Sequence, residues 1–151
     1  MDLKVSFEGL DELKRAFDLL PQRVAVLAAS KAVRAGANVI LKAARAKVPT
    51  DTGNLKRSLA IKILNKKRDA MNVAALIGPR SGRVAKKGKF AGKKINDGFY
   101  GFFVEYGTKK MRAEPFMRPA FDENVVAVQQ AIVDVIGEAI EAEARKFYRV
   151  R

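Results

Sequence analysis

A long helical segment between two prolines constrains the fold of this chain more than any other feature. Small and apolar residues recur at helical spacing over Gln22–Lys47, which predicts one continuous, alanine-rich helix. Pro21 suits a first helical turn, and Pro49 ends the helix because the residue before a proline avoids helical angles. One face of small residues would let a sheet or a second helix approach closely. That face comprises Val24, Ala28, Ala32, Ala35, Val39 and Ala43.

Alternating patterns predict a small antiparallel sheet. Residues 3–7 alternate between apolar and polar and suggest a short strand, followed by a helical pattern over residues 10–20. Residues 59–63 and 73–77 also alternate, and a polar stretch separates them. We therefore expect a β-hairpin whose second strand stops at Gly78-Pro79.

The second half of the chain contains an aromatic segment and a final helix. Phe99–Tyr106 is apolar on both faces, so we interpret it as a strand that is covered on both sides. One cover would come either from the protein's own core or from a neighbouring subunit. Residues 121–140 have the spacing of a long amphipathic helix, and its polar face is acidic.

The order of these elements predicts an α+β fold in a single domain over residues 1–151. We expect a small antiparallel sheet, with the long N-terminal helix and the C-terminal amphipathic helix packed on it. No uninterrupted apolar run approaches the roughly 20 residues that span a bilayer. The first residues also lack the basic start and apolar stretch of a signal peptide.

The chain contains no histidine and no cysteine. Most zinc sites and most general bases at neutral pH use one of these residues. We therefore predict no enzymatic activity and expect no catalytic residue, cofactor or metal. The missing cysteines also rule out disulfides and fit synthesis in a reducing cytosol.

The net charge of +14 is concentrated in the middle of the chain, where residues 56–112 hold 16 Lys/Arg and 3 Asp/Glu. The most basic part contains several glycines and little that could be buried. We interpret it as an exposed loop over about residues 80–97. Its basic residues are Arg80, Arg83, Lys86, Lys87, Lys89, Lys93 and Lys94.

This basic loop has three interpretations. Clustered Lys and Arg bind nucleic acid by releasing counterions from phosphates, and Phe90 would stack on a base. The loop would also suit an acidic protein surface, such as the acidic face of the final helix in the next copy. Such head-to-tail packing closes into rings. The third interpretation is a solvated loop without a partner.

The stretch VPTDTGNLKRSL joins the long helix to the hairpin. Asp51 between two threonines suggests a metal or nucleophile site, but no partner acid, base or phosphate-loop spacing accompanies it. We therefore interpret it as a capped turn in which Gly53 tolerates positive φ. The residues of this motif turn are Pro49, Asp51, Thr52, Gly53, Leu55 and Ser58.

Glu105 is an acid inside the aromatic segment, where a carboxylate must be paired or reach water. We expect a basic partner from the same subunit or the next. Arg118 would pair either with Glu105 or with Asp122, and the prolines around Arg118 would start the final helix, with Phe116 and Phe121 anchoring it. The residues assigned to the core or to a subunit interface are Phe99, Tyr100, Phe102, Phe103, Glu105, Tyr106, Pro115, Phe116, Arg118 and Pro119.

Together these segments are similar to a known family. VPTDTGNLKRSL matches the pattern VPVDTG-x-L-x-x-S, and FFVEYGTKKMRAEPFMRPAFDE matches an aromatic strand ending in VE-[FY]-GT followed by PFMRPA. Both patterns resemble the HK-type or lambdoid family of bacteriophage tail components, which includes neck and minor tail (Z-like) proteins of long-tailed phages. The order of elements agrees as well, and the resemblance covers nearly the whole chain.

The resemblance implies a non-enzymatic structural protein of the virion, located at the neck or tail and synthesised in the cytoplasm of the bacterial host. It implies action at the head–tail junction as a homo-oligomeric ring, in contact with other neck or tail proteins and with no membrane. The alternative is a basic nucleic-acid-binding protein that uses residues 80–94.

Overall fold

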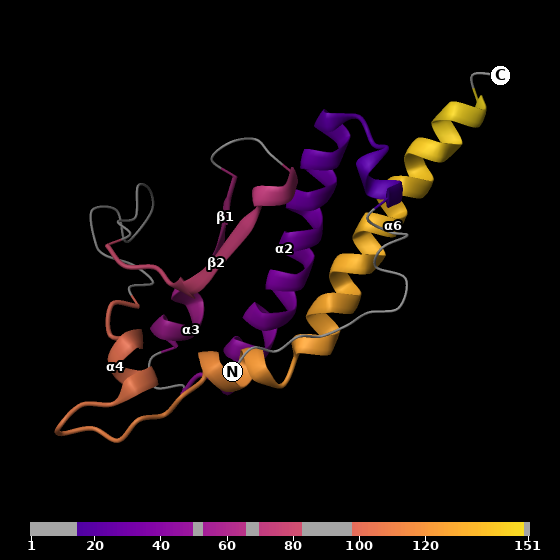
Figure 1. Ribbon diagram of the computed structural model, residues 1–151. Coiled ribbons are helices and arrows are strands. Elements are labelled where there is room, and N and C mark those ends of the chain that lie inside the picture. The colour runs from indigo at the N-terminus through magenta and orange to yellow at the C-terminus, as the bar shows by residue number, and fades with distance from the viewer. Residues whose placement is uncertain (1–14, 50–52, 66–69, 83–97, 150–151) are drawn as a thin grey trace.

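Helices and a β-hairpin make up the fold, as the element order predicts. The computed structural model describes residues 15–49, 53–65, 70–82 and 98–149 (Figure 1). The expected strand at residues 3–7 lies outside these residues. The elements are α2 (Gln22–Lys47), α3 (Asn54–Ser58), β1 (Leu59–Leu64), the short 3-10 helix η1 (Ala70–Asn72), β2 (Ala74–Pro79), α4 (Gly101–Tyr106), α5 (Met117–Asp122) and α6 (Val125–Arg149).

Helix α2 has the bounds that its flanking prolines predict. Pro21 is the N-cap, and Val48 leaves the helix with ψ 130, the extended conformation that a following proline requires. The predicted buried face is only partly correct. Ala28 and Ala32 are buried, but the stripe is wider and rotated, because α6 and the hairpin pack on adjacent sides of α2. The buried residues are Ala25, Ala28, Ala29, Ala32, Gly36, Ala37, Ile40, Leu41 and Ala44.

Small residues on α2 let α6 approach it closely, and Figure 1 shows the two helices side by side. A Cβ placed on Gly36 would lie 3.0 Å from Val128 Cγ1 and 3.1 Å from Ile132 Cγ1. Both distances are tighter than most contacts that real Cβ atoms make, so the two side chains would have to move. The close approach therefore depends on Gly36, which lies outside the predicted face, while Ala28 and Ala32 are the members of that face that are buried.

Strands β1 and β2 form the predicted antiparallel hairpin. Their register runs from Leu59 opposite Pro79 to Leu64 opposite Ala74. The second strand begins one residue later and ends two residues further along than expected, because Gly78 and Pro79 are paired rather than breaking the strand. Proline is tolerated at such an end because no ladder hydrogen bond needs its nitrogen.

The prediction of a strand over Phe99–Tyr106 is wrong. Residues 101–106 form the short helix α4, which ends where the N–H of Gly107 donates to the carbonyl of Phe103 at 2.8 Å. A short run that is apolar on every side fits either a covered strand or a helical turn, so periodicity does not separate them. Tertiary contacts of Glu105, described below, favour the helix.

The sequence predicts one final helix, but the structure has two in its place. Helix α5 ends at Asp122, and α6 begins at Val125. Asn124 lies at the break, where its Nδ2 donates to the carbonyl of Ala120 at 3.0 Å and its own carbonyl accepts from Val128 N at 2.9 Å. Asn124 thus accepts the first backbone bond of α6 with its carbonyl, while its side chain bonds back to α5, so the two helices meet at this residue.

The main core lies at the C-terminal end of α2, where α3, β1 and α5 converge. Phe116 and Leu59 are its largest fully buried side chains, each 1% exposed. Phe116 therefore anchors this end of the fold as expected, whereas Phe121 does not, since it is 51% exposed. The buried cluster comprises Ile40, Leu41, Ala44, Val48, Leu55, Leu59, Phe116 and Ala120.

By length and composition, α2 is apolar enough to cross a membrane, with a mean hydropathy of 1.5 over 18 residues. Lys31 and Arg34 interrupt the apolar residues of this helix, in keeping with the expectation of no long uninterrupted apolar run. In the structure 39% of that window is buried, where α2 packs against α6 and the hairpin.

Two glycine substitutions test the α2–α6 contact. Gly36→Leu should lower the free energy of unfolding by about 1–3 kcal/mol, since the added side chain must displace Val128 and Ile132. Gly137→Ala on α6 is the matched control, because a Cβ there meets nothing within 4 Å. It should raise stability by about 1 kcal/mol through helix propensity alone. Urea unfolding measures both, and a neutral Gly36→Leu would contradict this packing.

Candidate functional site

The carboxylate of Glu105 is 5% exposed and joins α4 to the start of α5. Its Oε2 accepts hydrogen bonds from Phe116 N at 2.7 Å and Met117 N at 2.9 Å. Its Oε1 accepts from Arg118 N and from Arg118 Nε, both at 3.1 Å. We call this set of contacts the Glu105 anchor.

The Glu105 anchor acts as an N-cap supplied by a different helix. Free N–H groups at a helix start need acceptors. Phe116 occupies the N-cap position of α5, and its side chain has no acceptor to offer. Arg118 closes the arrangement by donating from Nη2 to the Glu105 carbonyl at 3.2 Å. The expected pairing of Arg118 with Glu105 is confirmed. The sequence analysis did not predict the three backbone N–H donors. The signal that could have indicated them is Glu105, a single acid ten residues before a helix start with the pattern Pro-Phe-x-Arg-Pro.

The anchor also sets the charge state of Glu105. Burial raises the pKa of the carboxyl group, but hydrogen bonds from the N–H groups of Met117, Phe116 and Arg118 and from the Arg118 side chain outweigh it. The net effect lowers the pKa below its ordinary value of 4.5. Glu105 is therefore ionised at neutral pH.

Gly107 lets the chain turn back so that residue 116 can reach residue 105. It has φ 74, a left-handed value that favours glycine, and an added Cβ would lie 2.8 Å from Ala113 N. Thr108 and Met111 then pair in a tight bridge. Glu114 N donates to the Val104 carbonyl at 2.8 Å, which brings the returning segment beside α4. The glycine of the VEYGT segment is thus required by the geometry of the anchor.

Aromatic side chains cover the outer side of α4. Phe102 and Tyr106 have ring centroids 4.6 Å apart, and Phe103 lies edge-on to Phe102 at 6.2 Å. The guanidinium of Arg118 lies 5.0 Å from the centre of the Tyr106 ring, so the anchor also holds one edge of this group. The exposed fractions of Phe99, Phe102, Phe103 and Tyr106 are 67%, 64%, 46% and 56%. We call these four residues the aromatic surface.

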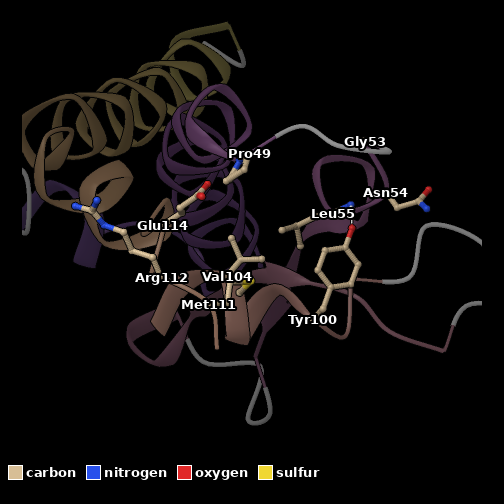
Figure 2. Close-up of a pocket in the computed structure, with 9 residues that line it drawn as sticks. All are labelled: Pro49, Gly53, Asn54, Leu55, Tyr100, Val104, Met111, Arg112 and Glu114. Atoms are coloured by element: carbon tan, nitrogen blue, oxygen red, sulfur yellow. Dashed lines mark hydrogen bonds between the residues drawn. The ribbon is translucent and has the colours of Figure 1, made fainter. Parts of the chain in front are cut away.

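The motif turn packs directly behind α4. Gly53 has φ 70 and starts α3, as the capped-turn interpretation predicts for this glycine. Leu55 is buried, and its N–H donates to the Tyr100 hydroxyl at 3.1 Å (Figure 2). Ser58 is buried too, with Oγ donating to the Leu55 carbonyl at 2.7 Å. A Cβ on Gly98 would collide with the Ser58 side chain, so the two segments are in close contact.

Some of the predicted site residues are buried, some are exposed, and others lie outside the described residues. Phe116 belongs to the core, and Glu105 is buried in its anchor. The aromatic surface is exposed, so these four residues do not belong to the core of the subunit, and their assignment to a subunit interface stays a prediction. Among the basic-loop residues Arg80 is described and exposed; its N–H donates to the Ser58 carbonyl at 3.0 Å. Outside the described residues lie Asp51, Thr52, Arg83, Lys86, Lys87, Lys89, Lys93 and Lys94.

Comparison with known protein families gives one match that covers most of the chain. Residues 11–107 match the family model described as "Bacteriophage HK97-gp10, putative tail-component". This chain belongs to that family. The resemblance noted in the sequence is thereby confirmed, and the matched region includes the motif turn, α4 and Gly107. No curated protein and no solved structure gives a significant match.

Family membership supports a structural role in a phage tail and, in general terms, a place in the virion. Among the described side chains, no group of three His, Cys, Asp or Glu could hold a metal ion. What the arrangement does supply is an apolar surface held in place by a buried carboxylate and the arginine that it binds.

Replacing Glu105 by Gln tests the anchor. The amide loses the charge-assisted bonds and turns an N–H₂ toward backbone donors, so stability at pH 7 should fall by about 2–4 kcal/mol. Because the pKa of Glu105 is lowered in the folded state, its contribution is complete above the ordinary carboxyl pKa of 4.5, which applies to the unfolded chain, and is lost as pH falls through the lower folded pKa. The difference between the two proteins in urea unfolding should therefore shrink below about pH 4.

Glu123→Gln is the matched control for this measurement. Glu123 pairs with Lys47 at 2.7 Å, but its side chain is 59% exposed. Its loss should cost less than about 1 kcal/mol. Equal effects of the two substitutions, or a Glu105→Gln deficit that does not depend on pH, would contradict the anchor.

Proposed function

We propose that this chain is a non-enzymatic structural subunit that assembles as a ring of identical copies at the head–tail junction of a long-tailed phage or prophage. It would act as a neck or tail-completion protein, made in the host cytoplasm and incorporated into the virion. Its partners would be its own copies and other neck or tail proteins, with no membrane involved.

The aromatic surface is the observation that carries this proposal. Soluble monomers seldom expose several large apolar side chains together, and such patches mark protein–protein contacts. Phenylalanine and tyrosine are also enriched in the centres of interfaces. All four residues lie on or beside a helix of six residues within the family match.

Contacts on two sides of α4 hold the aromatic surface in place, which favours binding. A flexible loop would have to be ordered on binding, which costs free energy, whereas a preorganised surface avoids most of that cost. Here α4 is fixed behind by Leu55 and in front by Arg118, which itself is held by the buried carboxylate of Glu105. The surface is therefore ready to bind without rearrangement.

The distribution of charge favours contact between unlike ends of two copies. Asp134, Glu138 and Glu141 are exposed on α6, whereas the excess of basic residues lies in residues 56–112. Complementary charges on different parts of one molecule favour head-to-tail packing, which closes into a ring when the rotation allows.

Phe103→Ser tests the role of the aromatic surface. Since Phe103 is 46% exposed, the substitution should leave the melting temperature within a few degrees but reduce the assembled mass. Light scattering would follow this mass, alone and with purified tail or connector components, against a subunit of 16.6 kDa. Leu76→Ser is the control, because Leu76 is 56% exposed on the hairpin. Wild-type assembly by the Phe103 variant would count against this surface as an interface.

A second candidate function is nucleic-acid binding by residues 80–94. The net charge of +14 favours it, and DNA passes through a phage neck, so both functions are compatible. If it holds, the DNA affinity should fall steeply with salt. Replacing Lys86, Lys87 and Lys89 with Gln should then reduce the slope of log K against log salt by about 0.9 for each phosphate that these lysines neutralise. An unchanged slope would exclude this segment as the DNA-binding surface.

A further inference from the structure

A pocket lies on the side of α4 opposite the aromatic surface. It has a volume of about 440 Å³ and opens between α3, α4 and the segment that returns from Gly107. Figure 2 shows Leu55 and Tyr100 on one side, Arg112 and Glu114 on the other, and Val104 and Met111 between them. The pocket is thus apolar in its centre and charged along one edge.

Helix α4 separates this pocket from the aromatic pair Phe102 and Tyr106. Residues four apart share one face of a helix, so Tyr100 and Val104 lie together on the pocket side. Phe102 and Tyr106 form the next such pair, and a shift of two residues turns them by about 200° to the far side. One short helix therefore carries a projecting pair of rings on one face and the wall of a cavity on the other.

The size of the pocket fits the projecting pair. A cavity of about 150 Å³ lined by apolar side chains holds one benzene molecule. The pocket of about 440 Å³ has room for two rings and part of their stems. The two rings are already in contact, tilted by 37° with centroids 4.6 Å apart, so they would enter as one unit.

Charges on the two faces are complementary as well. Arg118 lies beside Tyr106 and has a side chain that is 57% exposed. Glu114, on the charged edge of the pocket, is exposed and forms no ion pair with any described residue. A ring pair seated in the pocket would bring Arg118 of one copy toward Glu114 of the other.

We propose that Phe102 and Tyr106 of one copy insert into the α3–α4 pocket of a second copy. This inference rests on the proposed ring and deepens it by naming the contact. Because the ring pair and the pocket occupy opposite sides of α4, each copy can use both at once. The contact is heterologous, so it extends from copy to copy and closes when the rotation permits.

Mixing two variants tests this contact in the full-length chain. Phe102→Ser removes a projecting ring but keeps the pocket, and Met111→Trp fills the pocket but keeps the ring pair. Both positions are exposed, at 64% and 42%, so both variants should fold with wild-type melting temperatures. We expect each variant alone to be monomeric. A 1:1 mixture should form a dimer of two 16.6 kDa chains and nothing larger, because only one complete contact is available.

Leu76→Ser is the matched control, since Leu76 is 56% exposed on the hairpin and belongs neither to the ring pair nor to the pocket. It should behave as wild type with respect to this contact and assemble beyond a dimer. Assembly of either single variant to wild-type mass would overturn the inference. So would a mixture that stays monomeric while the wild type forms rings, and that result would leave the proposed ring intact. A wild type that is monomeric with and without tail components would refute both.

Discussion

The buried carboxylate of Glu105 is the interaction on which the functional half of this structure depends. It satisfies three N–H groups at the start of α5 and one guanidinium N–H, and these groups lie 11 to 13 residues further along the chain. The positive φ of Gly107 makes that return possible. Without the carboxylate, the start of α5 would keep buried donors without acceptors, and a buried donor without a partner is costly.

The anchor links the core to the surface. On its inner side it fixes Phe116, the largest fully buried residue of the core. On its outer side it orients Arg118, which lies over Tyr106 at the edge of the aromatic surface. The motif turn supports α4 from behind through the bond between Leu55 and the Tyr100 hydroxyl. Segments that are separate motifs in the sequence therefore meet around one short helix, and together they hold the aromatic surface that we propose as the contact with other subunits.

Sequence reasoning succeeded where a local rule decides the outcome. Prolines at 21 and 49 set the ends of α2, and alternation set the hairpin. The need to pair a buried acid indicated the ion pair of Glu105 with Arg118. Reasoning failed where tertiary contacts decide. Six residues from Gly101 to Tyr106 are too few for periodicity to separate a helix from a covered strand, and the carboxylate that favours the helix binds donors in a distant segment.

Exposure of the aromatic residues was the hardest feature to predict. A run with five aromatic residues suits a core equally well, and only the packing of α4 against the motif turn shows which side is covered. Likewise, the pattern over residues 121–140 is continuous, and the break before α6 depends on the bond from Asn124 to the Ala120 carbonyl. The charge pattern indicated complementary surfaces but could not show which elements display them.

Electron cryo-microscopy of the assembled protein, as a ring or within the phage tail, tests the central claim most directly. We predict that the outer side of α4 is buried between neighbouring copies, with the carboxylate of Glu105 still bound to the start of α5. An assembled particle in which Phe102, Phe103 and Tyr106 all face solvent would contradict this view of the protein.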